Sequence, residues 1–138
     1  VRDRDHFSID LTIQRGLEKE KEKKARKLSI EELKKRVKFS PRVPGNRDVK
    51  TKTYERSSIV SELAKRRAGG RCHLCLMEAP FKTKDGSPYL ETHHIVWLSN
   101  GGEDTPENTV ALCPNCHRKM HSLDLKKDRD FLIDAADS

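Results

Sequence analysis

The chain has 138 residues, of which 37% are charged and 33% are hydrophobic, and its formal net charge is +7. This length suits one small domain with appendages, and an aromatic content of 5% argues against a large apolar core. No apolar run approaches the roughly 20 residues of a bilayer span, which excludes a membrane protein, and no apolar segment at the N-terminus marks a secretory precursor.

The positive charge is concentrated in the first half of the chain. Up to Arg71 there are 22 Lys and Arg against 11 Asp and Glu, a net charge of +11, whereas residues 72–138 carry 7 against 11, a net charge of −4. This asymmetry favours a polyanionic partner, with nucleic acid first among the candidates. The alternative is a solvated charged helix, because Glu and Lys interleave over residues 18–27.

Residues 1–48 are predicted to form a basic, largely helical arm. Apolar residues alternate early in the segment 7–17, which indicates a strand there, while the later part of that segment is ambiguous. The run at 18–27 has almost no apolar face and predicts either an exposed helix or a flexible tether. His6, within this arm, is expected to be solvated.

A capping box marks the start of the next helix. Ser29 is the predicted N-cap and Glu32 its reciprocal partner, and three apolar residues then share one face, so the pattern predicts a short amphipathic helix over 30–38. Two prolines and a glycine at 41–45 end this helix and indicate a linker.

A further helix is predicted between an extended segment and a glycine pair. Residues 49–54 alternate weakly, Ser57 or Ser58 can cap a helix that runs to Ala68, and Gly69 and its neighbour Gly70 end it. The residues expected to face inward are Val60, Leu63, Ala64 and Ala68.

All four cysteines lie in two CxxC pairs. Cys72 and Cys75 form the first pair, and Cys113 and Cys116 form the second. Each pair places two thiolates on one side of a tight turn, and two pairs complete the tetrahedral shell of four thiolates that suits Zn²⁺. Two disulfides in a secreted domain are the alternative, but no secretion signal accompanies them. A structural zinc would also supply folding energy that a small core cannot.

Histidines gather between and beside these cysteine pairs. A strand is predicted over 89–92, leading into His93 and His94, and a second over 110–112, followed by a helix that begins at Pro114 and runs to about residue 122. His117 and His121 are four residues apart and share a face of that helix, while Cys116 is turned by about 100° from His117. One helix can therefore serve two metal sites. Alternatively, either histidine completes or caps the zinc site. His73, inside the first CxxC pair, is expected to be solvated.

Taken in order, these motifs resemble those of a known family. The chain contains, in order, the CxxC pair at 72–75, Glu91-Thr92-His93-His94-Ile95, Asn108, Leu112-Cys113-Pro114-Asn115-Cys116-His117 and His121. This series resembles the motifs of the HNH endonucleases, and most closely those of the McrA-type restriction nucleases. The resemblance implies an α+β fold: a small ββα-metal domain over 49–122, stapled by the four-cysteine zinc site and preceded by the basic arm. Residues 123–138 form a C-terminal tail, whose apolar patch at 131–133 either docks on the body or continues into further sequence.

The resemblance also implies roles for individual residues. His94 corresponds to the general base, and Asn108 to the residue that holds the loop between the two strands. His117 corresponds to a ligand of the catalytic metal, and His93 to the other main ligand. His121 matches an additional histidine of some nucleases that binds metal or phosphate.

The chemistry of these residue types agrees with such roles. A neutral imidazole can take a proton from water near physiological pH. A single divalent cation can polarise a phosphate and stabilise the leaving oxygen, and nitrogen ligands favour Mn²⁺, Ni²⁺, Co²⁺ or Zn²⁺ over Mg²⁺. Glu91 lies two residues before His93 on the same strand face and is a candidate hydrogen-bond partner of the metal ligands. A surface salt bridge is the alternative for Glu91.

Several cations near these motifs are candidate contacts to DNA phosphates. Arg118 and Lys119 lie on the predicted helix, and Arg56, Lys65, Arg66, Arg67 and Arg71 lie upstream. Such contacts position the backbone without reading sequence, and for each residue the alternative is a solvated surface charge. Trp97 is expected to pack under the loop rather than to stack on a base.

The sequence therefore predicts a metal-dependent HNH endonuclease that hydrolyses DNA, and specifically the cleavage domain of a restriction enzyme for modified DNA. The alternatives are a zinc-knuckle module that binds DNA without cutting it and a structural protein organised by zinc. Because the chain begins with Val1 and its basic arm is too short for a base-flipping pocket, we expect the domain that reads the DNA to lie upstream. We further expect a cytoplasmic protein of prokaryotic or phage type, and the sequence allows a homodimer.

Overall fold

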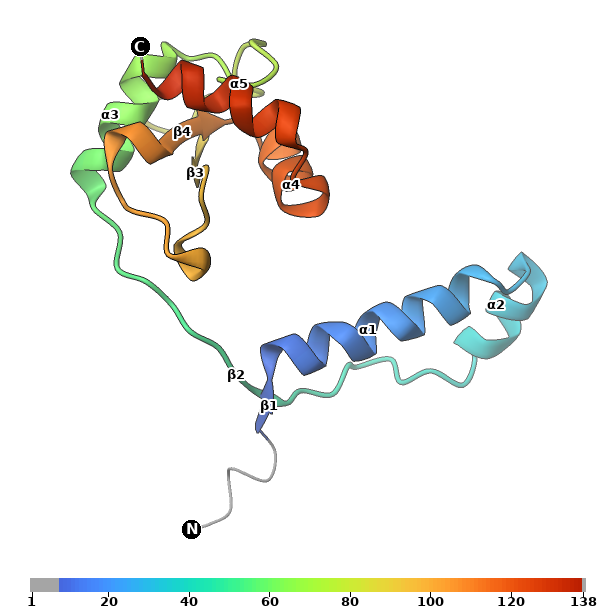
Figure 1. The fold of residues 1–138 in the computed structure, drawn as a ribbon. Helices are drawn as coiled ribbons and strands as arrows, with labels where there is room; N and C mark the ends of the chain where they lie inside the picture. Colours follow the sequence, from blue (N-terminus) through green and yellow to red (C-terminus); the bar gives the residue numbers. More distant parts are fainter. Residues whose placement is uncertain (1–7, 138) are drawn as a thin grey trace. The chain divides into compact units, whose positions relative to one another are not determined.

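The computed structural model describes residues 8–137 and divides the chain into two compact units, one ending at Thr53 and the other beginning at Tyr54 (Figure 1). Among the helices of the described residues, none combines the length and the apolar character that a bilayer span requires.

The first unit is mainly helical. A short strand, β1 (Ser8–Asp10), leads directly into α1 (Leu11–Arg26), and β2 (Asp48–Lys50) pairs with β1 in parallel, with Ile9 opposite Val49. β1 lies where the alternation predicted a strand. Of the two alternatives for residues 18–27, the structure shows the helix, through Arg26. His6 lies outside the described residues.

At the start of α2 (Ile30–Val37), the structure shows one of the two hydrogen bonds of the predicted capping box. The Glu32 backbone N–H donates to Ser29 Oγ at 3.1 Å, as predicted for an N-cap. The Glu32 carboxylate lies instead 3.4 Å from Arg36 Nε, one turn along the helix. No residue of α2 is buried, and Val37 is 67% exposed.

The second unit begins with α3 (Ser58–Ala68). Ser57 is its N-cap, since its Oγ accepts from the Val60 N–H at 3.2 Å, and Gly69 ends the helix with a φ of +60° that favours glycine. Ala64 is fully buried, but Leu63 is 42% exposed, so the predicted inward position of Leu63 is wrong. The reason is that the helix presents Ala64 to the sheet, and its neighbour is turned by about 100°.

The centre of the second unit is a ββα arrangement. The strands β3 (Glu91–His94) and β4 (Thr109–Leu112) are antiparallel, and His93 lies opposite Val110. Two 3-10 turns, η2 (Leu98–Asn100) and η3 (Pro106–Asn108), lie in the connection between them. The helices α4 (Pro114–Leu123) and α5 (Lys126–Ala136) follow β4. The predicted α+β class and the helical N-terminal segment are confirmed.

Helices enclose β4, and α5 contributes to the core. Every residue of β4 is buried, because α3, α4 and α5 all contact it (Figure 1). Leu132 and Ala136 of α5 join the same apolar cluster as Val110, Leu112 and Met120. Of the two alternatives for the C-terminal apolar patch, the structure shows docking on the body. The domain boundaries after residues 48 and 122 stay predictions.

Candidate metal centres and active site

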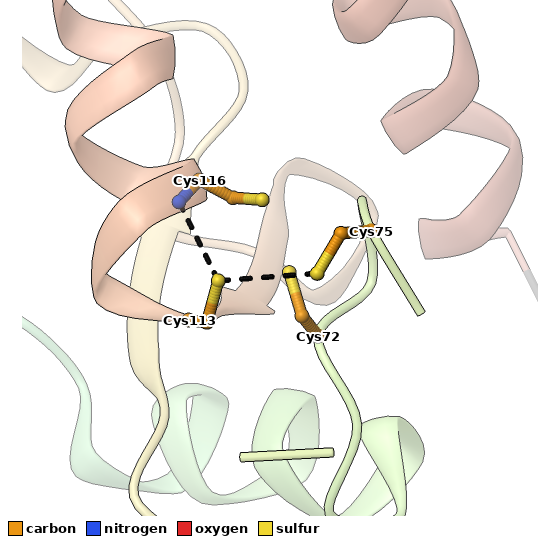
Figure 2. Close-up of side chains that lie close together, drawn as sticks. All are labelled: Cys72, Cys75, Cys113 and Cys116. Carbon is orange, nitrogen blue, oxygen red and sulfur yellow. Dashed lines mark hydrogen bonds between the residues drawn. The ribbon is translucent and has the colours of Figure 1, made fainter. Parts of the chain in front are cut away.

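The four cysteine side chains converge on one point (Figure 2). Cys72 and Cys75 follow α3, and Cys113 and Cys116 lie at the start of α4. Their Sγ atoms all lie within 4.8 Å of one another, and the Sγ atoms of Cys75 and Cys113 are 3.9 Å apart. All four are free thiols, so the structure does not support the disulfide alternative. A set of four thiols on two tight turns fits a tetrahedral Zn²⁺.

In each turn a backbone N–H group points to one of the two sulfur atoms. The Leu74 N–H points to Cys72 Sγ at 3.4 Å, and the Cys116 N–H points to Cys113 Sγ at 3.5 Å. Burial acts to raise the pKa of Cys72, but these and neighbouring backbone N–H donors outweigh it, and the pKa of Cys72 is lowered. Burial raises the pKa of Cys116. A bound cation would keep all four ligands ionised.

A second cluster consists of three histidines from two elements. His93 comes from β3, and His117 and His121 come from successive turns of α4. One nitrogen of each ring lies within 4.8 Å of the others, and the Nε2 atoms of His117 and His121 are 3.2 Å apart. The same α4 helix therefore contributes to both clusters, as its spacing predicted. With four thiols already together, neither His117 nor His121 is needed to complete the cysteine site.

His93 is suited to be a metal ligand rather than a cation. Its side chain is 2% exposed, and burial together with the neighbouring imidazoles lowers its pKa to about 3. It is therefore neutral near pH 7. Its Nε2 is buried and has no hydrogen-bond partner within residues 8–137. An unpartnered buried nitrogen beside two further imidazoles fits a divalent cation such as Zn²⁺, Ni²⁺, Co²⁺ or Mn²⁺.

Glu91 orients one of these histidines. Its Oε1 lies 2.8 Å from His117 Nδ1, and its Oε2 accepts a hydrogen bond from the Tyr89 hydroxyl at 2.7 Å. The Tyr89 hydroxyl and His117 lower the pKa of Glu91, so the carboxylate is ionised and His117 Nδ1 donates to it. Nε2 of His117 is then left to face His93 and His121. Of the two alternatives for Glu91, the structure shows the contact with a candidate ligand. The contribution of Tyr89 was not foreseen.

Asn108 ties together the two ends of the connection between the strands. Its Oδ1 accepts from the Val96 N–H at 2.8 Å, and its Nδ2 donates to Val96 O at 3.0 Å and to Glu103 O at 2.7 Å. These contacts are those that the expected loop-holding role of Asn108 requires.

The loop that Asn108 holds is tightly folded against β3. A Cβ at Gly102 would lie 1.8 Å from Val96 O, so only glycine fits there. The Gly102 N–H donates to Trp97 O at 2.9 Å. The ring of Trp97 lies 5.0 Å from that of His121, which places Trp97 as a packing residue beside the histidine cluster.

His94 faces away from the histidine cluster. Neighbouring residues of a strand point to opposite faces, and His93 faces α4 while His94 contacts residues beside α3. His94 is 7% exposed, and its Nε2 lies 2.8 Å from Asp104 Oδ1. Asp104 Oδ2 in turn accepts from the backbone N–H of Ser57 at 2.6 Å. Sequence reasoning missed Asp104.

The candidate DNA-binding cations differ in their surroundings. Arg67 donates to the carbonyls of Ala136, Pro106 and Thr109, each at 2.9 Å. The expectation that Arg67 contacts DNA does not fit this placement, because its guanidinium holds α5 and the start of β4 to α3. The other candidate cations are exposed. Arg66 pairs with Glu62, Arg71 pairs with Glu78, and Lys119 pairs with Asp128. The remaining three are Arg56, Lys65 and Arg118.

His73 is not solvated, which corrects the expectation from the sequence. Its Nδ1 accepts a hydrogen bond from the Ala111 N–H at 2.9 Å, and its own backbone N–H donates to Ala111 O at 2.9 Å. Burial and the nearby Arg67 lower the pKa of His73. The first cysteine turn therefore runs alongside β4, and the imidazole of His73 serves as an acceptor at its edge.

Comparison with known proteins shows what the residues of this site are similar to. Residues 72–123 match the model of the HNH endonuclease family. The chain is 50% identical over 70 residues to the type IV methyl-directed restriction enzyme EcoKMcrA of Escherichia coli K12, covering 51% of this chain and 25% of that protein. It is 44% identical over 36 residues to anaredoxin of a Nostoc species, covering 26% of this chain and 47% of that protein.

A solved structure gives the same result. The type IV phosphorothioation-dependent restriction endonuclease ScoMcrA superimposes with a TM-score of 0.52 and 31% identity, over 60% of this chain and 16% of that one. The resemblance to HNH endonucleases and to the McrA-type restriction enzymes is therefore confirmed. The chain spans about a quarter of the length of EcoKMcrA and less than half of anaredoxin.

Proposed function

We propose, on the premise that residues 72–123 match the HNH endonuclease family, that this chain is the metal-dependent cleavage domain of a DNA endonuclease. The observation that carries the proposal is the convergence of His93, His117 and His121 at a point distinct from the four cysteines. Two clusters of different chemistry, one of four thiols and one of three imidazoles, support one structural and one catalytic ion.

The two ions would have different roles. The cysteines would hold Zn²⁺ in a closed shell that stabilises the second unit. The histidines would hold one divalent cation with coordination positions open to substrate, and that cation would polarise the scissile phosphate and stabilise the leaving oxygen. Three nitrogen ligands favour Mn²⁺, Ni²⁺, Co²⁺ or Zn²⁺ over Mg²⁺.

The remaining side chains of the site would position and activate the reactants. His94 would accept the proton of the attacking water, and Asn108 would keep the loop around His94 closed through its three hydrogen bonds. Glu91 would fix the ring of His117. Arg118 and Lys119, exposed on the same helix as His117 and His121, would attract the DNA backbone.

Modified DNA is the proposed substrate of the whole protein. The Escherichia coli relative is named as methyl-directed and the solved structure as phosphorothioation-dependent. Because these relatives share this domain but are named for different modifications, we place the reading of the modification in a separate, upstream domain. A homodimer would supply the two active sites that cutting both strands requires, and a cytoplasmic location would fit such an enzyme.

A plasmid-nicking assay tests the proposal. The purified chain is incubated with supercoiled plasmid and Mn²⁺, Ni²⁺ or Mg²⁺, with His94→Ala as the matched inactive variant. We expect nicked or linear plasmid with at least one metal and none with the variant. Binding without cleavage under every metal, unchanged by His94→Ala, would instead identify a zinc-knuckle DNA-binding module. Cleavage of methylated and of unmethylated plasmid by the full-length protein, measured side by side, tests the proposed substrate.

A further inference from the structure

We propose that Asp104 is a positioning residue for His94: its carboxylate accepts a hydrogen bond from Nε2–H and so leaves Nδ1 as the basic atom of the imidazole. This inference rests on the proposed function, in which His94 takes the proton of the attacking water. It assigns an atom to that step and adds a residue to the site.

The contacts of Asp104 determine the direction of the hydrogen bond. Oδ1 lies 2.8 Å from His94 Nε2, and Oδ2 lies 2.6 Å from the Ser57 nitrogen, so each oxygen faces a different partner. The hydrogen bond from the Ser57 N–H lowers the pKa of Asp104 most, and the hydrogen bond from His94 lowers it further. The carboxylate therefore stays ionised. An ionised carboxylate only accepts hydrogen bonds, so the proton between the two groups belongs to Nε2.

With a proton on Nε2, the neutral ring must carry its lone pair on Nδ1. Among residues 8–137, the hydrogen bond of the His94 ring is made through Nε2, and Nδ1 has no partner there. His94 is 7% exposed, so its ring is surrounded by protein and rotates less freely than a surface imidazole. A carboxylate partner that fixes the tautomer of a histidine base is a known device in hydrolytic sites.

Asp104 is itself held by two elements. The Ser57 N–H that it accepts belongs to the N-cap of α3, and the Ser57 hydroxyl binds the Val60 N–H of the same helix. The loop on either side of Asp104 is fixed by Asn108, which donates to the carbonyl of Glu103 at 2.7 Å. The general base is therefore braced by α3 and the loop together.

The proton balance of the step is simple. Water donates one proton to Nδ1 of His94 as its oxygen bonds to phosphorus, and the bond from phosphorus to the leaving sugar oxygen breaks. That oxygen takes a proton from solvent water. His94 is transiently an imidazolium that keeps its Nε2–H on Asp104, and the carboxylate stabilises this charge without itself being protonated.

The tautomer of His94 tests the proposal without any need for cleavage. Long-range ¹H–¹⁵N correlation spectra of the full zinc-loaded chain, with histidine ¹⁵N-labelled and His94 assigned from His94→Ala, distinguish Nε2–H from Nδ1–H. At about pH 8 we expect predominantly Nε2–H in the original chain and in Glu107→Gln, an exposed neighbouring acid. We expect a mixture in Asp104→Ala. A predominant Nδ1–H form, or an unchanged tautomer in Asp104→Ala, would overturn the proposal.

Kinetics then link the tautomer to the reaction. Asp104→Ala and Asp104→Asn should lower kcat by at least about tenfold, within the ~10²–10⁴-fold that general base catalysis contributes, with little change in KM. Introduced into His94→Ala, Asp104→Ala should cause no further loss. An additional loss in that background, or an unchanged kcat in the single variants, would contradict a role through His94. If no metal supports cleavage although the tautomer depends on Asp104, the proposed function fails while the hydrogen-bond assignment holds.

Discussion

The Nε2 atoms of His117 and His121 lie 3.2 Å apart, one helical turn from each other on α4. Glu91 contacts Nδ1 of His117, so Nε2 of His117 is the nitrogen that faces His121. A cation bound by both Nε2 atoms would replace any proton between them. This contact, together with the buried Nε2 of His93, is the basis of the first prediction.

Glu91→Gln should weaken the binding of a second metal. The amide is a poorer partner for the Nδ1–H of His117 than the carboxylate, and loss of such a partner typically costs 10–100-fold in metal affinity. Titration calorimetry with Mn²⁺ or Ni²⁺ on zinc-loaded protein measures this. Tyr89→Phe, which removes only the hydroxyl that donates to Glu91, should have a smaller effect. Equal affinities of Glu91→Gln and the original chain would refute the orienting role of Glu91.

Cys72→Ser should unfold the second unit, whereas His94→Ala should not. Cys72 is fully buried in the apolar cluster and is one of the four proposed zinc ligands, and structural zinc contributes about 10–16 kcal/mol of folding energy. Thermal melts followed by circular dichroism compare the two variants, and a strong chelator should reproduce the effect of Cys72→Ser. Equal destabilisation by both substitutions would contradict a structural role for the cysteine cluster and a catalytic role for His94.

Arg67→Ala should destabilise the second unit by about 2–3 kcal/mol, because three carbonyl oxygens lose a charged donor. Urea unfolding measures the free energy. Arg66→Ala is the matched control: Arg66 is exposed and pairs with Glu62 one turn away, so its loss should stay within about 0.5 kcal/mol. Similar losses for the two arginines would mean that Arg67 does not hold α3, β4 and α5 together.

Leu132→Ala should cost about 2–5 kcal/mol if α5 belongs to the core. Leu132 is fully buried, whereas its neighbour Ile133 is 45% exposed. Ile133→Ala therefore serves as the control and should have a clearly smaller effect on unfolding by urea. A negligible loss for Leu132→Ala would show that α5 is not docked in solution.

Local spacing in the sequence was sufficient to predict two strands, the helix after them and the cysteine cluster, while the ββα-metal fold and the ligand role of His93 came from the resemblance to HNH endonucleases. The two CxxC pairs, the strand before His93 and the four-residue spacing of His117 and His121 are short-range patterns, and short-range patterns determine which side chains share a turn or a helix face. The N-caps Ser29 and Ser57 were predictable for the same reason.

The contacts that sequence reasoning missed join distant parts of the chain. Arg67 stands in a run of three cations, and nothing local distinguishes it from its neighbours, because its partners are carbonyls at residues 106, 109 and 136. His73 binds a backbone N–H on β4, 38 residues away. Asp104 reaches His94 only because the intervening loop folds back over Gly102. Such pairings depend on tertiary packing and leave no periodic signal.

The dependence of DNA cleavage on a second metal tests the central claim most directly. Protein with one zinc per chain is mixed with supercoiled plasmid, and cleavage is measured as Mn²⁺ or Ni²⁺ is added, alongside the metal content of the protein. We expect no cleavage with zinc in the cysteine site alone, a saturable rise in cleavage as a second ion binds, and loss of both in His117→Ala. Full cleavage by protein that holds a single zinc, or a second ion bound equally well by His117→Ala, would contradict the account.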